Sequence, residues 1–333
     1  MVSFGPRQLA NRLSEPDASD PEQERPVARF QAPAMIRGAI ESGLRVAAGA
    51  GEALLAPLGA RSRSFGQEVV LTKTVHRPYR LPDRPWFMAQ SWEDLLFAHW
   101  PLPVGELRRV VPPQIPIDTY DGTAWIAITP FRVGALRLRG LPHLPGVTSF
   151  PETNVRTYAT IDEKPGIYFL SLDAASAVAV SAARRSYRLP YFHARMSARR
   201  AGDWIEYQST RVSHDGPAAE LRARYRPTGR RFEAEHGSLE QFLVERYCLY
   251  TLDERRLVCR ADIHHPPWPL QPAEAEFELN TMAEPFGVSL RGDPLLHFSR
   301  REDVLIWTLE RQPASTAAGT NAYSRKKRAQ TRM

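Results

Sequence analysis

From Trp86 onward the chain alternates short apolar runs with clusters of turn-forming residues, a spacing typical of an antiparallel β protein. Three turn sequences separate neighbouring runs: Asp121-Gly122, residues 163–166 and residues 201–203. Asp-Gly between alternating runs is the strongest of these signals, because both central residues of a type I′ turn need a positive φ. The pattern therefore predicts three β-hairpins.

Short helical patterns interrupt the predicted strands. Asp173 precedes one of them as a predicted N-cap, and Ser238 precedes another as part of a capping box with Gln241. The patterns cover residues 104–111, 174–185 and 239–246. Together these elements predict one α+β domain, mainly antiparallel β, with a large curved sheet.

One predicted strand, residues 150–158, carries an unusual set of polar side chains. Because strand side chains alternate between two faces, Glu152, Asn154, Arg156 and Tyr158 would share one face. An acid, an amide, a guanidinium and a phenol on one face suit the wall of a polar pocket. The same pattern also fits a solvent-facing edge strand on which Glu152 and Arg156 are merely solvated.

The two ends of the chain differ from its body. Residues 1–65 combine proline-rich, charged sequence with a stretch of small apolar residues, and are predicted to be disordered or to form an appended helix. The folded domain is predicted over 66–311, and residues 312–333 are expected to form a disordered basic tail. Most of the excess charge lies in this tail, and one short basic cluster makes few phosphate contacts, so the net charge of +7 predicts no specific nucleic-acid partner.

No apolar run is long enough to span a membrane, and the N-terminus lacks the pattern of a secretory signal. We therefore expect a cytoplasmic protein with no membrane span. Cys248 and Cys259 are too few for a disulfide framework, and both are expected to be buried free thiols.

Several longer motifs resemble those of the YqjF-like family, a bacterial family of unknown function. They occur in the same order as in that family, at residues 92–101, 121–125, 152–158, 189–194, 245–250 and 263–270. The similarity covers about residues 73–309. It implies a fold like that of acetoacetate decarboxylase, in which a curved antiparallel sheet with a few flanking helices closes into a cone-like barrel around a pocket.

The resemblance also implies site residues. Glu152 is similar in position to a pocket Glu of the decarboxylases, and residues 182–192 resemble the segment that carries their Schiff-base lysine. In that alignment Tyr191 and Phe192 stand where the decarboxylases have two lysines, so the catalytic amine is missing. Lys164 is expected in a turn and Lys73 before the barrel, and neither suits a buried Schiff-base role. No cofactor is predicted.

Within such a barrel, Glu152, Arg156 and Tyr191 are the catalytic candidates. Arg156 could hold a carboxylate through two parallel hydrogen bonds, and Glu152 could act as an acid or base if burial raises its pKa. A buried structural Glu152–Arg156 pair is the alternative, and Tyr191 could simply fill the volume of the missing lysine. The candidate ligand-binding residues are Asn154, Tyr158, Arg184 and His265.

A metal site is not predicted. His264 and His265 are adjacent and would point to opposite faces of a strand, so both cannot join His99 or His193 in one site without a sharp turn. His99 is instead expected to be a core histidine with satisfied hydrogen bonds. The sequence also lacks the glycine-rich and nucleophile motifs of nucleotide-binding proteins and serine hydrolases.

The sequence thus leads to two main hypotheses. In the first, the protein binds an anionic organic acid and performs lysine-independent acid/base chemistry of a lyase type. In the second, the same residues form a non-catalytic ligand-binding module. A scaffold that uses the N-terminal segment and the tail is a third alternative, and homo-oligomerisation is left open.

Overall fold

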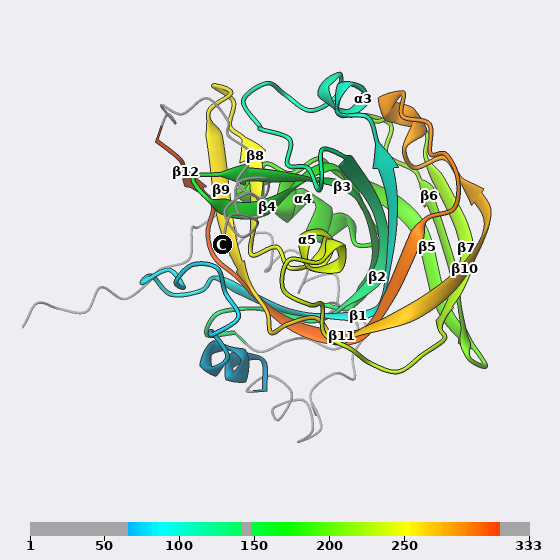
Figure 1. Cartoon of the computed structure of the whole chain (residues 1–333), viewed down its shortest axis with the longest axis horizontal. Coiled ribbons are helices and arrows are strands. Elements are labelled where there is room, and N and C mark those ends of the chain that lie inside the picture. The colour runs from blue at the N-terminus through cyan, green and yellow to red at the C-terminus, as the bar shows by residue number, and fades with distance from the viewer. Residues whose placement is uncertain (1–65, 142–147, 314–333) are drawn as a thin grey trace, which may run out of the picture.

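In the described part of the chain, residues 66–141 and 148–313 of this computed structural model, twelve strands join in one mixed, mostly antiparallel sheet (Figure 1). The strands are β1 Met88–Leu102, β2 Ala124–Leu138, β3 Phe150–Ile161, β4 Lys164–Ala174, β5 Tyr191–Ala201, β6 Trp204–Arg211, β7 Glu220–Pro227, β8 Cys248–Leu252, β9 Val258–His264, β10 Leu270–Asn280, β11 Leu295–Ile306 and β12 Glu310–Arg311. The helical segments are η1 Gln67–Thr72, α3 Val104–Arg108, α4 Ala177–Tyr187, α5 Leu239–Val244 and η2 Glu284–Phe286.

The sheet closes on itself twice. Pairing of β9 with β11 closes the circuit β9-β8-β4-β3-β2-β1-β11, and pairing of β4 with β5 closes the nine-stranded circuit β4-β3-β2-β1-β11-β10-β7-β6-β5. In Figure 1 the first circuit surrounds α5, whereas β5, β6, β7 and β10 lie on the other side of the β1–β2 wall. The prediction of a curved, mainly antiparallel sheet that closes into a barrel is therefore confirmed.

Strand β3 belongs to the wall that the two circuits share, so both of its faces are buried. Tyr158 packs in one hydrophobic core with residues of α5, while Val155 and Ala159 pack in a second core with residues of β6 and β7. This double burial has a chemical consequence, because every polar side chain on β3 must find its partners inside the protein.

All three predicted turns are present, and two of them lie at the predicted residues. Asp121 and Gly122 both have positive φ between the bridged residues Tyr120 and Thr123, and Gly202 has positive φ between β5 and β6. The second turn lies at 162–163 instead of 163–166, since Asp162 and Glu163 take the positive φ values and Lys164 already pairs with Ile161. The segment 115–120 forms isolated bridges rather than the predicted strand.

The predicted N-cap at Asp173 is wrong. Asp173 is the penultimate residue of β4, and its two carboxylate oxygens accept hydrogen bonds of 2.7 Å each from Arg211. The hydroxyl of Ser176 caps α4 instead, by accepting from the amide of Ala179. Because the Asp173 carboxylate forms a buried ion pair, β4 extends to Ala174 and the helix begins later than its sequence pattern predicts.

The predictions for residues 1–65 and for most of the C-terminal tail lie outside the described residues. At the inner end of that tail, the amide of Gln312 donates to the carbonyl of Val258, so the folded body extends at least one residue beyond 311. No helix in the described ranges is long and apolar enough to cross a membrane.

The Asp173–Arg211 pair gives a stability prediction, because both side chains are 1% exposed. Asp173→Asn would leave a buried guanidinium without its counter-charge, and we expect the free energy of unfolding to fall by about 3–5 kcal/mol. Asp215→Asn is the matched control, because it removes the exposed partner of Arg184 and should change stability very little. Urea unfolding of the three proteins checks this, and equal losses in both variants would contradict it.

Candidate functional site

The polar face of β3 is buried inside the protein. Glu152, Asn154, Arg156 and Tyr158 have exposures of 5%, 5%, 6% and 0%, and β3 lies between β2 and β4. The alternative of a solvent-facing edge strand is therefore wrong. Tyr158 packs against Phe242 of α5 at 5.3 Å between ring centroids, which places this face on the α5 side of the wall.

Glu152 and Tyr191 are brought together by the pairing of β4 with β5. The Tyr191 hydroxyl donates to Oε2 of Glu152 at 3.1 Å. Burial raises the pKa of Glu152 to about 8, an effect that the Tyr191 hydrogen bond opposes and the nearby charge of Asp173 reinforces. Glu152 is thus mainly protonated at neutral pH, and it can donate as well as accept a proton.

Arg156 is buried without a counter-ion. Its guanidinium lies over the ring of Phe97 at 5.3 Å, and neither Nε nor Nη2 has a hydrogen-bond partner. No acidic residue of the described chain forms an ion pair with it. The alternative of a structural Glu152–Arg156 pair therefore fails, since residues four apart on a strand are roughly 13 Å apart.

Other unpartnered polar atoms surround Arg156. Thr129 pairs directly opposite Asn154, and the Oγ1 of the first and the Oδ1 of the second have no hydrogen-bond partner. His99 lies two strands from Arg156, in register through Ala127, and both of its ring nitrogens are unpartnered. We call His99, Thr129, Asn154, Arg156 and Tyr158 the interior polar group.

The expectation that His99 has satisfied hydrogen bonds is wrong. Burial lowers the pKa of His99 well below its usual range, and the charge of Arg156 adds to this effect, so the ring is neutral. The 92–101 motif marked this segment, but a motif does not tell which side chains lie opposite it. Thr129 and the unpartnered indole nitrogen of Trp268 were missed as site residues for the same reason.

Tyr158 lies near two guanidinium groups. Arg246 stacks over its ring at 4.9 Å, and its own partners are Asp118 at 2.8 Å and the Phe242 carbonyl at 2.6 Å. Burial raises the pKa of Tyr158, while the charges of Arg156 and Arg246 oppose that rise. The Tyr158 hydroxyl lies beside the Arg156 guanidinium, which can only donate to it. The hydroxyl stays protonated at neutral pH and donates to no acceptor of the described chain, so it is available as a donor.

Arg184 lies apart from the interior polar group. Its Nη1 donates to the exposed Asp215 at 2.6 Å and its Nε to the backbone carbonyl of Tyr191 at 2.6 Å. Its ligand-binding role stays a prediction without geometric support.

His265 lies outside the interior polar group. Its Nδ1 donates to the carbonyl of Pro266 at 2.7 Å, and its ring stacks on Tyr247 at 4.7 Å. Burial lowers the pKa of His265 to about 3, so the ring is neutral. Trp268 lies between His265 and Phe97, at 5.0 Å from each ring, and so separates His265 from Arg156.

Within residues 66–141 and 148–313, no group of three or more His, Cys, Asp or Glu side chains is arranged to hold a metal ion. Hollows at the surface of the described chain include three with volumes of about 440, 310 and 350 Å³. None of these three is lined by a residue of the interior polar group.

The fold is similar to that of proteins with solved structures. An acetoacetate decarboxylase from Legionella pneumophila is 11% identical, with 75% of this chain and 97% of that chain covered and a TM-score of 0.49. The enduracididine biosynthesis enzyme MppR, solved in complex with pyruvate, is 12% identical, with coverages of 72% and 95% and a TM-score of 0.48. Likenesses this weak transfer no residue role and no activity to this chain.

Sequence comparison gives a closer relationship. The uncharacterized protein YqjF of Bacillus subtilis (strain 168) is 49% identical over 232 residues, which are 69% of this chain and 95% of that protein. The sequence model of the DUF2071 family, described as an uncharacterized conserved protein, matches residues 89–303. The chain therefore belongs to the DUF2071 family and is a homologue of YqjF.

Proposed function

We propose that the protein binds a small organic anion on the α5 side of the shared wall, with Arg156 as the counter-ion. The supporting observation is the state of Arg156 among the buried arginines of the described chain, which are Arg77, Arg137, Arg156, Arg211 and Arg246. The other four all donate hydrogen bonds to carbonyls, carboxylates or amide oxygens. A buried guanidinium without such a partner costs several kcal/mol, and a bound anion would offset that cost.

The surroundings of Arg156 favour a carboxylate ligand. A guanidinium presents a planar fork of donors that matches a carboxylate through two parallel hydrogen bonds. The Tyr158 hydroxyl and the neutral His99 ring add donors nearby, and the rings of Phe97 and Trp268 supply apolar surface. Ordered water could satisfy the same hydrogen bonds, but it would not neutralise the charge of Arg156.

Acid/base chemistry is the second candidate, because Glu152 carries a proton at neutral pH on the same face of β3. A general acid with a pKa near the working pH is efficient, and Tyr191 holds the Glu152 carboxyl in a fixed position. A ligand that contacts both Arg156 and Glu152 must be elongated, because the two Cα atoms are roughly 13 Å apart along the strand.

Imine chemistry is not part of this proposal. Lys73 is exposed, and the ammonium of Lys164 lies over the ring of Tyr79 at 5.5 Å, away from Glu152. Neither lysine of the described chain can therefore replace the missing amine. A bound acid would react through proton transfer alone or would not react at all.

The first test is Arg156→Met. Replacing an unpaired buried charge by an apolar side chain of similar size should raise the free energy of unfolding without ligand, by about 1–4 kcal/mol. The same variant should lose the increase in melting temperature that a panel of monocarboxylates and dicarboxylates gives the parent.

Arg246→Met is the matched control for this test. It leaves the buried Asp118 without its partner and should destabilise the protein. An Arg156→Met variant that is also destabilised, and still responds to the acids, would identify Arg156 as a structural residue.

The second test concerns the protonation of Glu152. A folded-state pKa of about 8, above the ordinary value of 4.5 for a Glu carboxyl, means that the unfolded chain releases this proton first as pH rises. As pH rises from 5 to 8, the free energy of unfolding of the parent should therefore fall relative to that of Glu152→Gln. The exposed Glu235→Gln is the control, and a difference between parent and Glu152→Gln that stays constant with pH would contradict the buried, protonated carboxyl.

The third test separates catalysis from binding alone. If Glu152 transfers a proton, incubation with the stabilising acids should convert at least one of them, and Glu152→Gln should lower that rate by about 100-fold or more while binding persists. Mass spectrometry of the incubations provides the measurement. Stabilisation by several acids with none of them converted would leave the non-catalytic binding module as the function.

A further inference from the structure

A second polar site lies on the outer face of β9. Ala261 and Ile263 point into the core, so Arg260 and Asp262 point outward. The segment 79–84 crosses over this outer face and leaves a hollow of about 350 Å³, which is several times the volume share of one water molecule, about 30 Å³. We call it the β9 hollow. It is lined by Tyr79, Arg80, Leu81, Pro82, Asp83, Arg84, Lys164, Arg260, Asp262 and Glu310.

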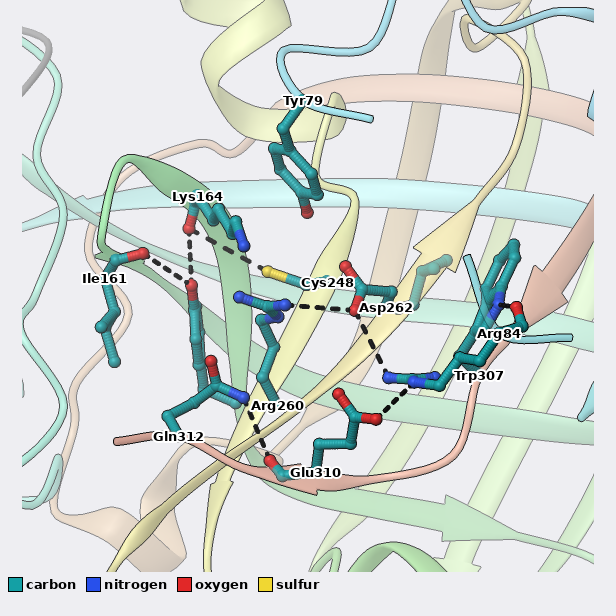
Figure 2. A network of polar contacts seen from close by, with 12 residues as sticks. Tyr79, Arg84, Ile161, Lys164, Cys248, Arg260, Asp262, Trp307, Glu310 and Gln312 are labelled. Carbon is teal, nitrogen blue, oxygen red and sulfur yellow. Dashed lines mark hydrogen bonds and ion pairs between the residues drawn. The ribbon is translucent and has the colours of Figure 1, made fainter. Parts of the chain in front are cut away.

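Several hydrogen-bond donors at the β9 hollow have no oxygen or nitrogen partner. The Tyr79 hydroxyl is buried, and its neighbour is the thiol of Cys248, a weak hydrogen-bonding group. Neither this hydroxyl nor Nε of Arg260 has an oxygen or nitrogen partner. Lys164 forms no ion pair with any described acid, and its ammonium lies at 5.5 Å from the Tyr79 ring centre. Figure 2 shows the Tyr79 hydroxyl, the Lys164 ammonium and the Arg260 guanidinium grouped around the Cys248 thiol.

The β9 hollow is lined by four cationic and three acidic side chains, and none of the acids Asp83, Asp262 and Glu310 forms an ion pair with Lys164. Asp262 is buried and is shared between Arg84 and Arg260 at the long distances of 3.7 and 3.4 Å (Figure 2). Among the described residues the Glu310 carboxylate forms an ion pair only with Arg84, through Nε. Lys164 is thus left as an unmatched cation beside donors without an oxygen or nitrogen partner, an arrangement that suits an anion with several acceptor oxygens.

We propose that the β9 hollow binds a small oxyanion, a phosphate or a carboxylate group, between Lys164, Arg260 and the Tyr79 hydroxyl. The bound group would join the 79–84 segment to the first residue of β4 and to β9. This site is separate from the interior polar group, because Arg260 lies on the outer face of the sheet and Arg156 on the inner face.

The test uses the scarcity of lysine, because Lys73 and Lys164 are the only lysines in the described part of the chain. Inorganic phosphate and acetate are titrated separately, and acetylation of each lysine by an amine-reactive ester is followed by mass spectrometry. With the oxyanion bound, acetylation of Lys164 should be slower by about threefold or more. Acetylation of the exposed Lys73 should keep its rate. Protection by phosphate alone or by acetate alone identifies the source of the oxyanion.

Variants localise the effect. Lys164→Gln should weaken the oxyanion-dependent rise in melting temperature, with an apparent affinity about tenfold or more lower, because a charge-assisted contact is lost. Lys73→Gln, which removes the same charge from an exposed position, should keep the parent response, and Tyr79→Phe should reduce it. Arg156→Met should also keep it, so failure of the interior site would not affect this result. Equal labelling of Lys164 with and without both anions, or equal responses of the two lysine variants, would overturn the proposal.

Discussion

The structure depends on a wall of strands that is buried on both faces. Because β1, β2, β3, β4 and β11 serve both closed circuits, neither side of β3 faces solvent. Buried polar groups need partners inside the protein, and their electrostatic interactions are stronger there than in water. A strand rich in polar side chains at this position is therefore costly unless its groups are paired by the fold or by a ligand.

The two faces of the wall meet this constraint differently. On one face, the Thr153 hydroxyl donates to the Tyr207 hydroxyl at 3.0 Å, and Asp173 pairs with Arg211. On the other face, Arg156 has no acidic partner and Asn154 keeps an unpartnered Oδ1. The fold thus supplies the buried Arg211 with a carboxylate but leaves Arg156 without one. This contrast is why we propose that Arg156 binds a ligand and does not serve the scaffold alone.

The two proposed sites use opposite faces of the sheet. The interior polar group is deep and has little competing negative charge, which favours a desolvated carboxylate held by one guanidinium. The β9 hollow opens to solvent and includes Asp262 and Glu310, so an oxyanion there would bind more weakly and would be more sensitive to salt. These differences allow the two sites to be tested independently.

The sequence by itself determined the features that depend on neighbouring residues. The alternation of β3, the Asp121-Gly122 turn and the Ser238 cap of α5 all follow from local spacing and backbone preference. The YqjF-like resemblance added the expectation of a closed barrel. The faces of the sheet were therefore predictable, but the partners on those faces were not.

Tertiary structure decided which polar groups are paired. Asp173 forms an ion pair with Arg211, 38 residues away, and does not cap the helix that follows it. Leaving the buried Arg211 unpaired would cost more free energy than one helix cap provides. Glu152 meets Tyr191 only because β4 pairs in parallel with β5, and His99 lacks partners only because of the side chains that the other strands place around it. Such contacts join residues far apart in the chain, so local periodicity fixes the direction of a side chain while the closure of the barrel fixes what it meets.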